Sequence, residues 1–231
     1  MSRSPLAKKR SDDEMRWAQP ISKENLGEQA YLSLRQALMR GHLRPGEPLL
    51  LRPMSARFGI SATPMREALL RLVSEKALAL DARGSVVVPT LTHEQLVEIR
   101  AIRTDLEGRS AASAATLATA KEIDGLDKVH QQIANCLANS QFDTAIDLNT
   151  EFHLRLCKLG GMQIIYEIVE SLWLRCGPII SHLYDDPPDF DPHPHIGVIA
   201  ALRNRDPDGA RKAIQFDIDS GGRGLLQFAK L

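Results

Sequence analysis

The chain has 231 residues, of which 43% are hydrophobic and 25% are charged, so it can bury a core and has the composition of a soluble globular protein. These values exclude a collagen-like chain, a disulfide scaffold and wholesale disorder. Aromatic residues make up only 5%, whereas Ala and Leu are abundant, which favours helices over a β-sandwich.

The sequence also indicates where the protein works. No stretch of about 18 apolar residues predicts a membrane span, and the first residues lack the apolar segment of a secretion signal. The three cysteines are scattered and form no CxxC pair, which is typical of reduced thiols. We therefore expect a cytoplasmic protein.

The net charge of zero hides an asymmetry along the chain. Residues 1–90 carry 15 Lys and Arg against 9 Asp and Glu, whereas residues 91–231 carry 14 against 20. A basic first third indicates contact with a polyanion, although a chance distribution of surface charge gives the same counts.

The first ninety residues predict a tail followed by a small domain. Residues 1–20 are polar and show no periodicity, so we expect a mobile tail. Residues 77–89 hold two β-prone arms around a polar, glycine-containing tip, which predicts a hairpin. Apolar spacing predicts three helices ahead of it, over residues 25–40, 53–58 and 61–74. This order of elements predicts a winged helix-turn-helix domain over residues 21–90.

After residue 90 the pattern is helical throughout. Capping boxes at Thr92 and Thr119 precede long stretches of helical apolar spacing. No strand signal appears, so we expect residues 91–231 to form an all-α bundle of six to seven helices. The later predicted helices span residues 144–159, 163–183, 195–204 and 207–228, with a loop over 185–194. The predicted fold class is therefore mostly α.

The third helix of the first domain carries groups that suit DNA. It begins with Ser61 and Thr63 and carries Arg66 one turn later. A helix N-terminus also presents free N–H groups and a positive dipole end to phosphate. Arg52 on the preceding helix and Arg83 at the hairpin tip add positive charge. Each residue alone is as well explained as a helix cap or a surface arginine, but their occurrence on three consecutive elements favours DNA contact.

This domain resembles the DNA-binding domain of the GntR family of bacterial transcription regulators. The resemblance is carried by residues 41–50 and 54–72, above all by the core Ser61-x-Thr-Pro-x-Arg-Glu-Ala-Leu69. It implies DNA contacts at six residues, namely Arg52, Ser61, Thr63, Arg66, Arg83 and Gly84. The chain departs from the family at Ala62, where an Arg usually reads guanine through a bidentate bond. Base preference at that operator position should therefore differ or relax.

The second part resembles the helical FCD effector domain of the FadR subfamily. The residues that match are Ile102-Arg103-x-x-Leu106-Glu107, Phe152-His153, and His195-x-x-Val198-x-x-Ala201-Leu202 followed by Arg205-Asp206. Together with the first domain, the resemblance covers about residues 24–228.

Four polar residues of this part can form a site for a divalent metal. Asn149 and His153 lie four residues apart, on one face of a helix. His195 and Asp217 each lie 11 residues from Asp206, so they stand level in an antiparallel helical hairpin. Such nitrogen and oxygen ligands suit zinc or nickel.

The resemblance implies the same four positions. Many FCD relatives bind a metal with one Asp and three His there, whereas this chain has Asn149 for the Asp and Asp217 for the last His. Asn is a neutral and weaker ligand. The alternative is that His153 and His195 anchor an organic ligand without a metal, or are hydrogen-bonded core residues.

Two arginines are candidates for binding an anionic effector. Arg103 and Arg175 can each place a guanidinium against a carboxylate, although a solvated helix face explains Arg175 equally well. Four other histidines have no evident partner and are expected on the surface, namely His42, His93, His130 and His182.

The sequence thus predicts a ligand-responsive transcription repressor. We expect a homodimer on double-stranded operator DNA, a small carboxylate metabolite as effector, a possible zinc or nickel ion, no organic cofactor and no membrane. The alternative is a metal-dependent hydrolytic enzyme that uses the His and Asp cluster, but the chain has no Ser-His-Asp arrangement, Walker loop or GxGxxG motif. An architectural DNA binder would leave the second domain without a role.

Overall fold

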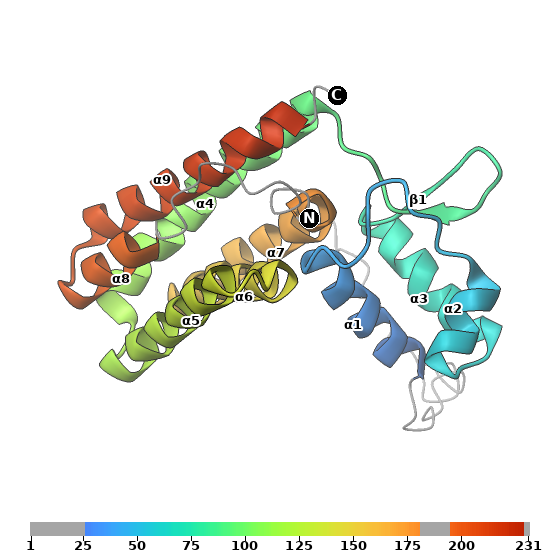
Figure 1. Ribbon diagram of the computed structural model, residues 1–231, viewed down its shortest axis with the longest axis horizontal. Helices are drawn as coiled ribbons and strands as arrows, with labels where there is room; N and C mark the ends of the chain where they lie inside the picture. The colour runs from blue at the N-terminus through green and yellow to red at the C-terminus, as the bar shows by residue number, and fades with distance from the viewer. Residues whose placement is uncertain (1–25, 181–194, 229–231) are drawn as a thin grey trace, which may run out of the picture.

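The computed structural model describes residues 26–180 and 195–228, with side chains described up to residue 221. The chain forms an N-terminal head and a larger helical body (Figure 1). Three sequence predictions lie outside the described residues: the mobile tail over 1–20, the loop over 185–194 and the surface position of His182. Among the described helices, none combines the length and the apolar character that crossing a membrane requires.

The head has the order of elements that the sequence predicts. Its elements are α1 (Leu26–Met39), α2 (Leu51–Phe58), α3 (Ala62–Ser74), β1 (Ala79–Leu80) and β2 (Val86–Val87). The strands pair antiparallel, with Leu80 opposite Val86. Helix α2 begins two residues before the predicted Pro53, because proline is tolerated throughout the first turn, where N–H groups have no partner within the helix. The head is a winged helix-turn-helix with a small hairpin.

Two turns fix the shape of the head. Gly59 adopts a left-handed φ of 66° and ends α2, which lets the chain turn at once into α3. At the hairpin tip, the Asp81 carboxylate accepts N–H groups from Arg83 and Ser85, each at 2.8 Å. These bonds hold the tip in one conformation.

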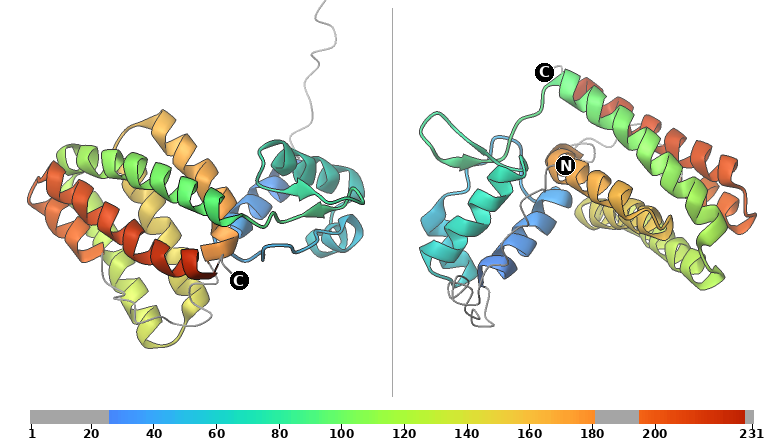
Figure 2. Two further views of the ribbon diagram at one scale, coloured as in Figure 1. Left: turned by 90° about the horizontal axis from the view of Figure 1, so that it is seen from above. Right: turned by 180° about the vertical axis from the view of Figure 1, so that it is seen from behind.

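The body is a bundle of six helices in the described part of the chain, which contains no strand after residue 90. The helices are α4 (His93–Leu117), α5 (Ala120–Ala138), α6 (Phe142–Leu159), α7 (Gln163–Ile180), α8 (His195–Arg203) and α9 (Pro207–Phe228). Both predicted capping boxes are present, at Thr92 with Gln95 and at Thr119 with Glu122. Helix α9 lies along α4, and α5 lies beside α6 (Figures 1 and 2).

The turn between α8 and α9 is anchored to the end of α4. Arg205 adopts a left-handed φ of 55°, and its guanidinium donates to the carbonyl oxygens of Ala115 at 3.2 Å and Ala118 at 2.6 Å. The Asp206 carboxylate accepts the N–H of Gly209 at 2.9 Å and so caps the start of α9. The helical hairpin is thereby fixed against the rest of the bundle.

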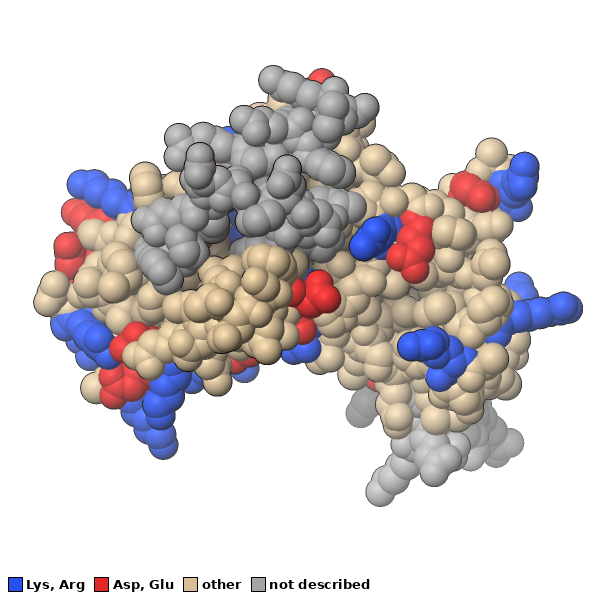
Figure 3. Space-filling model, in the orientation of Figure 1, with Lys and Arg blue, Asp and Glu red and all other residues tan. Residues whose placement is uncertain are grey.

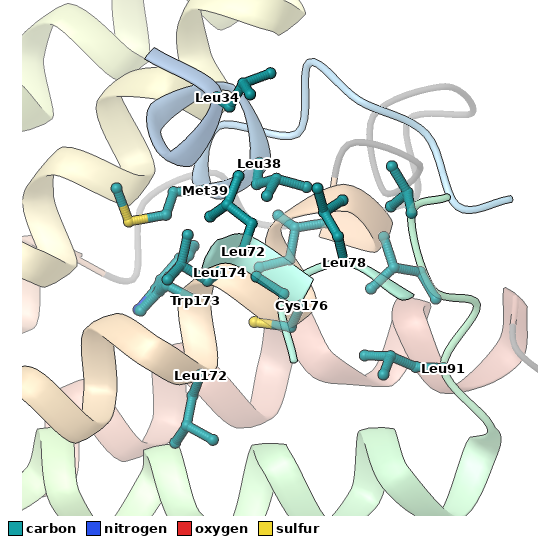
Figure 4. Close-up of a cluster of buried hydrophobic side chains, with 14 of the residues drawn as sticks. Leu34, Leu38, Met39, Leu72, Leu78, Leu91, Leu172, Trp173, Leu174 and Cys176 are labelled. Atoms are coloured by element: carbon teal, nitrogen blue, oxygen red, sulfur yellow. The ribbon is translucent and has the colours of Figure 1, made fainter. Parts of the chain in front are cut away.

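One hydrophobic core is shared by the head and the body. We call it the shared core: it joins Leu38 of α1 and Leu72 of α3 to Trp173 of α7 (Figure 4). Helices α1 and α7 approach backbone to backbone, because a Cβ on Gly177 would overlap the carbonyl oxygens of Leu38 and Met39. A second core lies within the body, among α4, α5, α6, α8 and α9.

Polar contacts border the junction of head and body. Arg35 of α1 donates to Glu170 of α7 at 2.8 Å, and both side chains are largely buried. His42, just after α1, lies 3.0 Å from Asp147 of α6. The position of the head is therefore set by the body and not by a flexible linker alone.

Candidate functional site

The six residues predicted to contact DNA are all exposed on the head, and we call them the recognition face: Arg52, Ser61, Thr63, Arg66, Arg83 and Gly84. Ser61, Thr63 and Arg66 lie on the first half of α3 and just before it. The Ser61 side chain makes no capping hydrogen bond. The first N–H groups of α3 therefore remain available to an anion such as a phosphate.

The other members of the recognition face flank α3. Arg52 lies in the first turn of α2, and Arg83 and Gly84 form the hairpin tip. Gly84 has a φ of 77°, which side chains rarely adopt, so glycine is required there. Lys and Arg side chains project from this end of the molecule (Figure 3). Ala62 is exposed as the first residue of α3, between Ser61 and Thr63 of the recognition face.

A second set of polar residues lies inside the body, and we call it the buried polar cluster: Arg103, Glu107, His153, His195 and Asp217. None is more than 7% exposed. Arg103 and Glu107 come from α4, His153 from α6, His195 from α8 and Asp217 from α9. The anchored turn between α8 and α9 places His195 and Asp217 at the same level, as the equal spacing from Asp206 predicts.

The cluster is a continuous chain of contacts. Arg103 Nε donates to Glu107 Oε1 at 2.7 Å, and Glu107 Oε2 lies 2.7 Å from His153 Nδ1. On the other side of the ring, His153 Nε2 lies 2.9 Å from Asp217 Oδ2. Asp217 Oδ1 in turn lies 3.5 Å from His195 Nε2. Each carboxylate therefore contacts two cationic or imidazole groups.

These contacts decide the charges of the cluster. Burial disfavours the charged form of His153, but the carboxylates of Glu107 and Asp217 outweigh it and raise the pKa of His153 to about 9. Burial also works against ionised carboxylates, yet Arg103 and His153 lower the pKa of Glu107, and His195 and His153 lower the pKa of Asp217. In the absence of a metal, the raised pKa favours the imidazolium form of His153 near neutral pH, with one ring N–H facing each carboxylate.

Three members of the cluster fit a divalent transition metal. His153, His195 and Asp217 each offer one ligand atom, and these atoms all lie within 4.8 Å of one another. Two imidazole nitrogens and one carboxylate oxygen match zinc or nickel better than magnesium or calcium. The donor set and its closeness therefore agree with the sequence prediction for these three residues.

The structure also places the two remaining residues predicted for the site. Asn149 is half-buried on α6, one turn before His153, and Arg175 is half-buried on α7. Their roles as metal ligand and effector contact stay predictions. Arg103 is buried and already paired with Glu107, and its guanidinium lies 4.0 Å from the ring centre of Trp173.

The sequence analysis missed two members of the site and misplaced one histidine. Glu107 and Trp173 were given no role, although the spacing of Glu107 four residues after Arg103 is typical of a helical ion pair. His130 is buried and not on the surface, with its ring edge-on to His195 and the ring centres 5.9 Å apart. Its position four residues after Leu126 on the apolar face of α5 was the available signal. His42 is exposed as expected, and His93 is half-buried.

Comparisons with known proteins identify the family. The model of the FCD domain matches residues 98–219, which is more than half of the chain, and the model of the bacterial regulatory proteins, gntR family, matches residues 26–88. The HTH-type transcriptional regulator McbR of Escherichia coli K12 is 32% identical over 185 residues, covering 78% of this chain and 84% of the relative. The HTH-type transcriptional repressor RspR of the same organism is 25% identical over 191 residues, covering 82% and 84%.

A solved structure gives the same result. The structure of E. coli McbR/YncC superposes with a TM-score of 0.81 at 29% identity, covering 90% of this chain and 99% of that one. The family consists of transcription regulators, which removes the hydrolytic enzyme that the sequence left as an alternative. The chain therefore belongs to the GntR family of bacterial regulatory proteins with an FCD C-terminal domain, and it is a DNA-binding transcription regulator and not an enzyme.

Proposed function

We propose that the chain is a ligand-responsive repressor that binds operator DNA through the recognition face and senses a small carboxylate in the body. The observation that carries this proposal is the buried polar cluster. Buried ion pairs add little to stability, and groups with shifted pKa values gather at functional sites. A cluster of five buried polar groups, four of which have shifted pKa values, is therefore better explained by a ligand than by a need for stability.

We assign the roles of the two parts accordingly. Residues 21–90 bind DNA, and residues 91–231 bind the effector and form the dimer. A single head presents one recognition helix, whereas a two-fold operator needs two of them at a fixed spacing. The working unit is therefore a homodimer, which light scattering of the full chain at micromolar concentration tests.

The proposed metal site consists of His153, His195 and Asp217, with Asn149 as a weaker fourth ligand. The metal, zinc or nickel, would supply a Lewis-acidic centre for a carboxylate oxygen. Two neutral imidazoles and one carboxylate leave a divalent ion with a net positive charge, so an anionic effector is favoured. The charge of Arg103 is balanced by Glu107, and Arg175 is the proposed second contact of the effector.

The experiment measures DNA affinity with and without candidate effectors. Duplexes are first selected from a random pool with the full chain, and gel shifts are then repeated with a panel of small mono- and dicarboxylates, with and without Zn²⁺. A true effector should change DNA affinity by about 5-fold or more. In variant protein that circular dichroism shows to be folded, His153→Ala should abolish this response and leave DNA binding without effector intact, since the cluster and the recognition face lie in different parts of the molecule. Failure to select any duplex, or identical affinity throughout the panel, contradicts the proposal.

A further inference from the structure

We propose that Glu107 is a positioning residue, which holds the His153 ring so that its Nε2 atom faces Asp217 and His195. This inference rests on the proposed metal site, and it assigns a role to a residue that is not itself a ligand. It follows from the contacts of the His153 ring, because Glu107 contacts one of its nitrogens and Asp217 contacts the other.

The two nitrogens of His153 have different partners on opposite sides of the ring. Nδ1 lies 2.7 Å from Glu107 Oε2, whereas Nε2 lies 2.9 Å from Asp217 Oδ2. A proton on Nδ1 that is donated to Glu107 leaves Nε2 as the nitrogen that can bind a metal. Such hydrogen bonds from a carboxylate to the far nitrogen of a ligating histidine fix both the tautomer and the orientation of the ring.

Glu107 is itself held firmly enough to do this. Its side chain is fully buried, and its Oε1 atom accepts hydrogen bonds from Arg103 Nε at 2.7 Å and from Trp173 Nε1 at 3.3 Å. The Arg103 guanidinium is fixed in turn against the face of Trp173. One carboxylate oxygen thus anchors Glu107, and the other oxygen is left for His153.

The same geometry separates Glu107 from the ligands. The group of mutually close ligand atoms comprises His153, His195 and Asp217, and it does not include Glu107. Arg103 offsets the charge of Glu107, so Glu107 provides a hydrogen bond without adding net negative charge beside the metal. Asp217 faces the ligand side of the ring, where its Oδ2 atom lies 2.9 Å from His153 Nε2.

The test compares the Zn²⁺ affinity of metal-stripped full-length variants, measured by competition with a chromophoric chelator. Glu107→Gln should weaken Zn²⁺ binding by about 10- to 100-fold, the range found when outer partners of ligating histidines are removed. Glu170→Gln is the matched control, because it removes a carboxylate from another arginine pair, with Arg35, that does not contact His153. It should leave the affinity unchanged.

A second measurement separates positioning from general loss of structure. In ¹⁵N-histidine-labelled protein with Zn²⁺ bound, wild-type His153 should carry its proton on Nδ1, and Glu107→Gln should reduce that population. His153→Gln assigns the signal. If Glu107→Gln leaves Arg103 unpaired and fails to fold, the double variant Arg103→Met/Glu107→Gln removes both charges and should show the same loss of affinity.

The outcomes distinguish this inference from the proposed function. If wild-type protein takes up no Zn²⁺, both the metal site and the role of Glu107 are overturned. If wild-type protein binds Zn²⁺ and Glu107→Gln binds it equally well, with the proton still on Nδ1 of His153, only the role of Glu107 is overturned. A weakened affinity with an unchanged proton position also overturns it, because the residue would then act on the fold and not on the ring.

Discussion

The recognition face and the buried polar cluster differ in how their residues are brought together. The face lies within residues 52–84, and all its side chains are exposed to solvent. The cluster draws on residues between Arg103 and Asp217, on four helices, and these residues are at most 7% exposed and contact one another. The side chains of the recognition face are available to an external partner, whereas those of the buried polar cluster already contact one another inside the protein. Substitutions in the face should therefore change DNA binding and spare the fold, and substitutions in the cluster should act on stability first.

The largest effect is expected when a buried charge loses its partner. Arg103→Met removes one of the two cationic partners of Glu107 and leaves an uncompensated negative charge in the interior, which should lower the free energy of unfolding by about 3–5 kcal/mol. Urea denaturation of metal-stripped protein measures the loss. The control is Arg203→Met, which breaks an exposed pair with Asp127 and should be indistinguishable from wild type. Equal effects of the two substitutions would contradict the comparison.

A smaller loss of stability is expected at the junction of head and body. Gly177→Ala places a methyl group against the backbone carbonyls of Leu38 and Met39, which cannot move aside as a side chain can. The expected cost is about 1–3 kcal/mol of unfolding free energy, typical of overpacking. Gly197→Ala is the matched control, because its new methyl group meets only the side chain of Ala213 at ordinary contact distance. The control should be neutral or slightly stabilising, since alanine favours helix.

Substitutions in the recognition face should weaken DNA binding and leave stability unchanged. Arg52→Ala and Arg66→Ala should each weaken specific DNA binding by about 1–3 kcal/mol if they contact base edges. Their thermal unfolding should match that of wild type, because both side chains are exposed. Gel shifts at matched salt and calorimetry provide the two measurements. Wild-type footprints in both variants would show that another surface of the head reads the DNA.

The most gradual effect is a pH dependence of stability in metal-stripped protein. The pKa of His153 is raised to about 9 in the folded state from an ordinary value of 6.5. Its stabilising contribution is therefore complete below about pH 6.5 and is lost as pH rises through 9, by about 1.4 kcal/mol per pH unit in between. His153→Gln should flatten this part of the profile. A wild-type profile that rises from pH 7 to 9 would show that His153 is neutral in the folded protein.

The contrast between the two regions also explains what the sequence predicts well. Ser61, Thr63 and Arg66 follow one another along one helix, so spacing alone places them on one surface. His195 and Asp217 were placed level by counting from Asp206, because a short turn between two helices leaves little freedom. In both cases, the spacing along the sequence determines how the residues lie relative to one another.

For the remainder of the cluster, the spacing along the sequence does not determine the relative positions of the residues. The contact of Trp173 Nε1 with Glu107 depends on how α7 packs against α4, and crossing angles are set by side chains from several helices together. The closeness of His153 and Asp217 depends likewise on α6 meeting α9. The prediction for His130 was wrong because it rested on the lack of an evident partner, although the spacing of His130 marks the apolar face of α5.

Because of the shared core, the head is poorly suited to transfer onto another protein as an independent unit. Leu34 and Leu38 of α1 are at most 1% exposed, and they pack in one core with Leu172 and Trp173 of α7. A chimera that transplants residues 26–88 onto a foreign body would uncover this apolar face, unless the new body brings its own match for α7. DNA specificity is therefore better exchanged between such regulators by grafting the recognition face alone. This leaves the shared core at the junction of head and body unchanged.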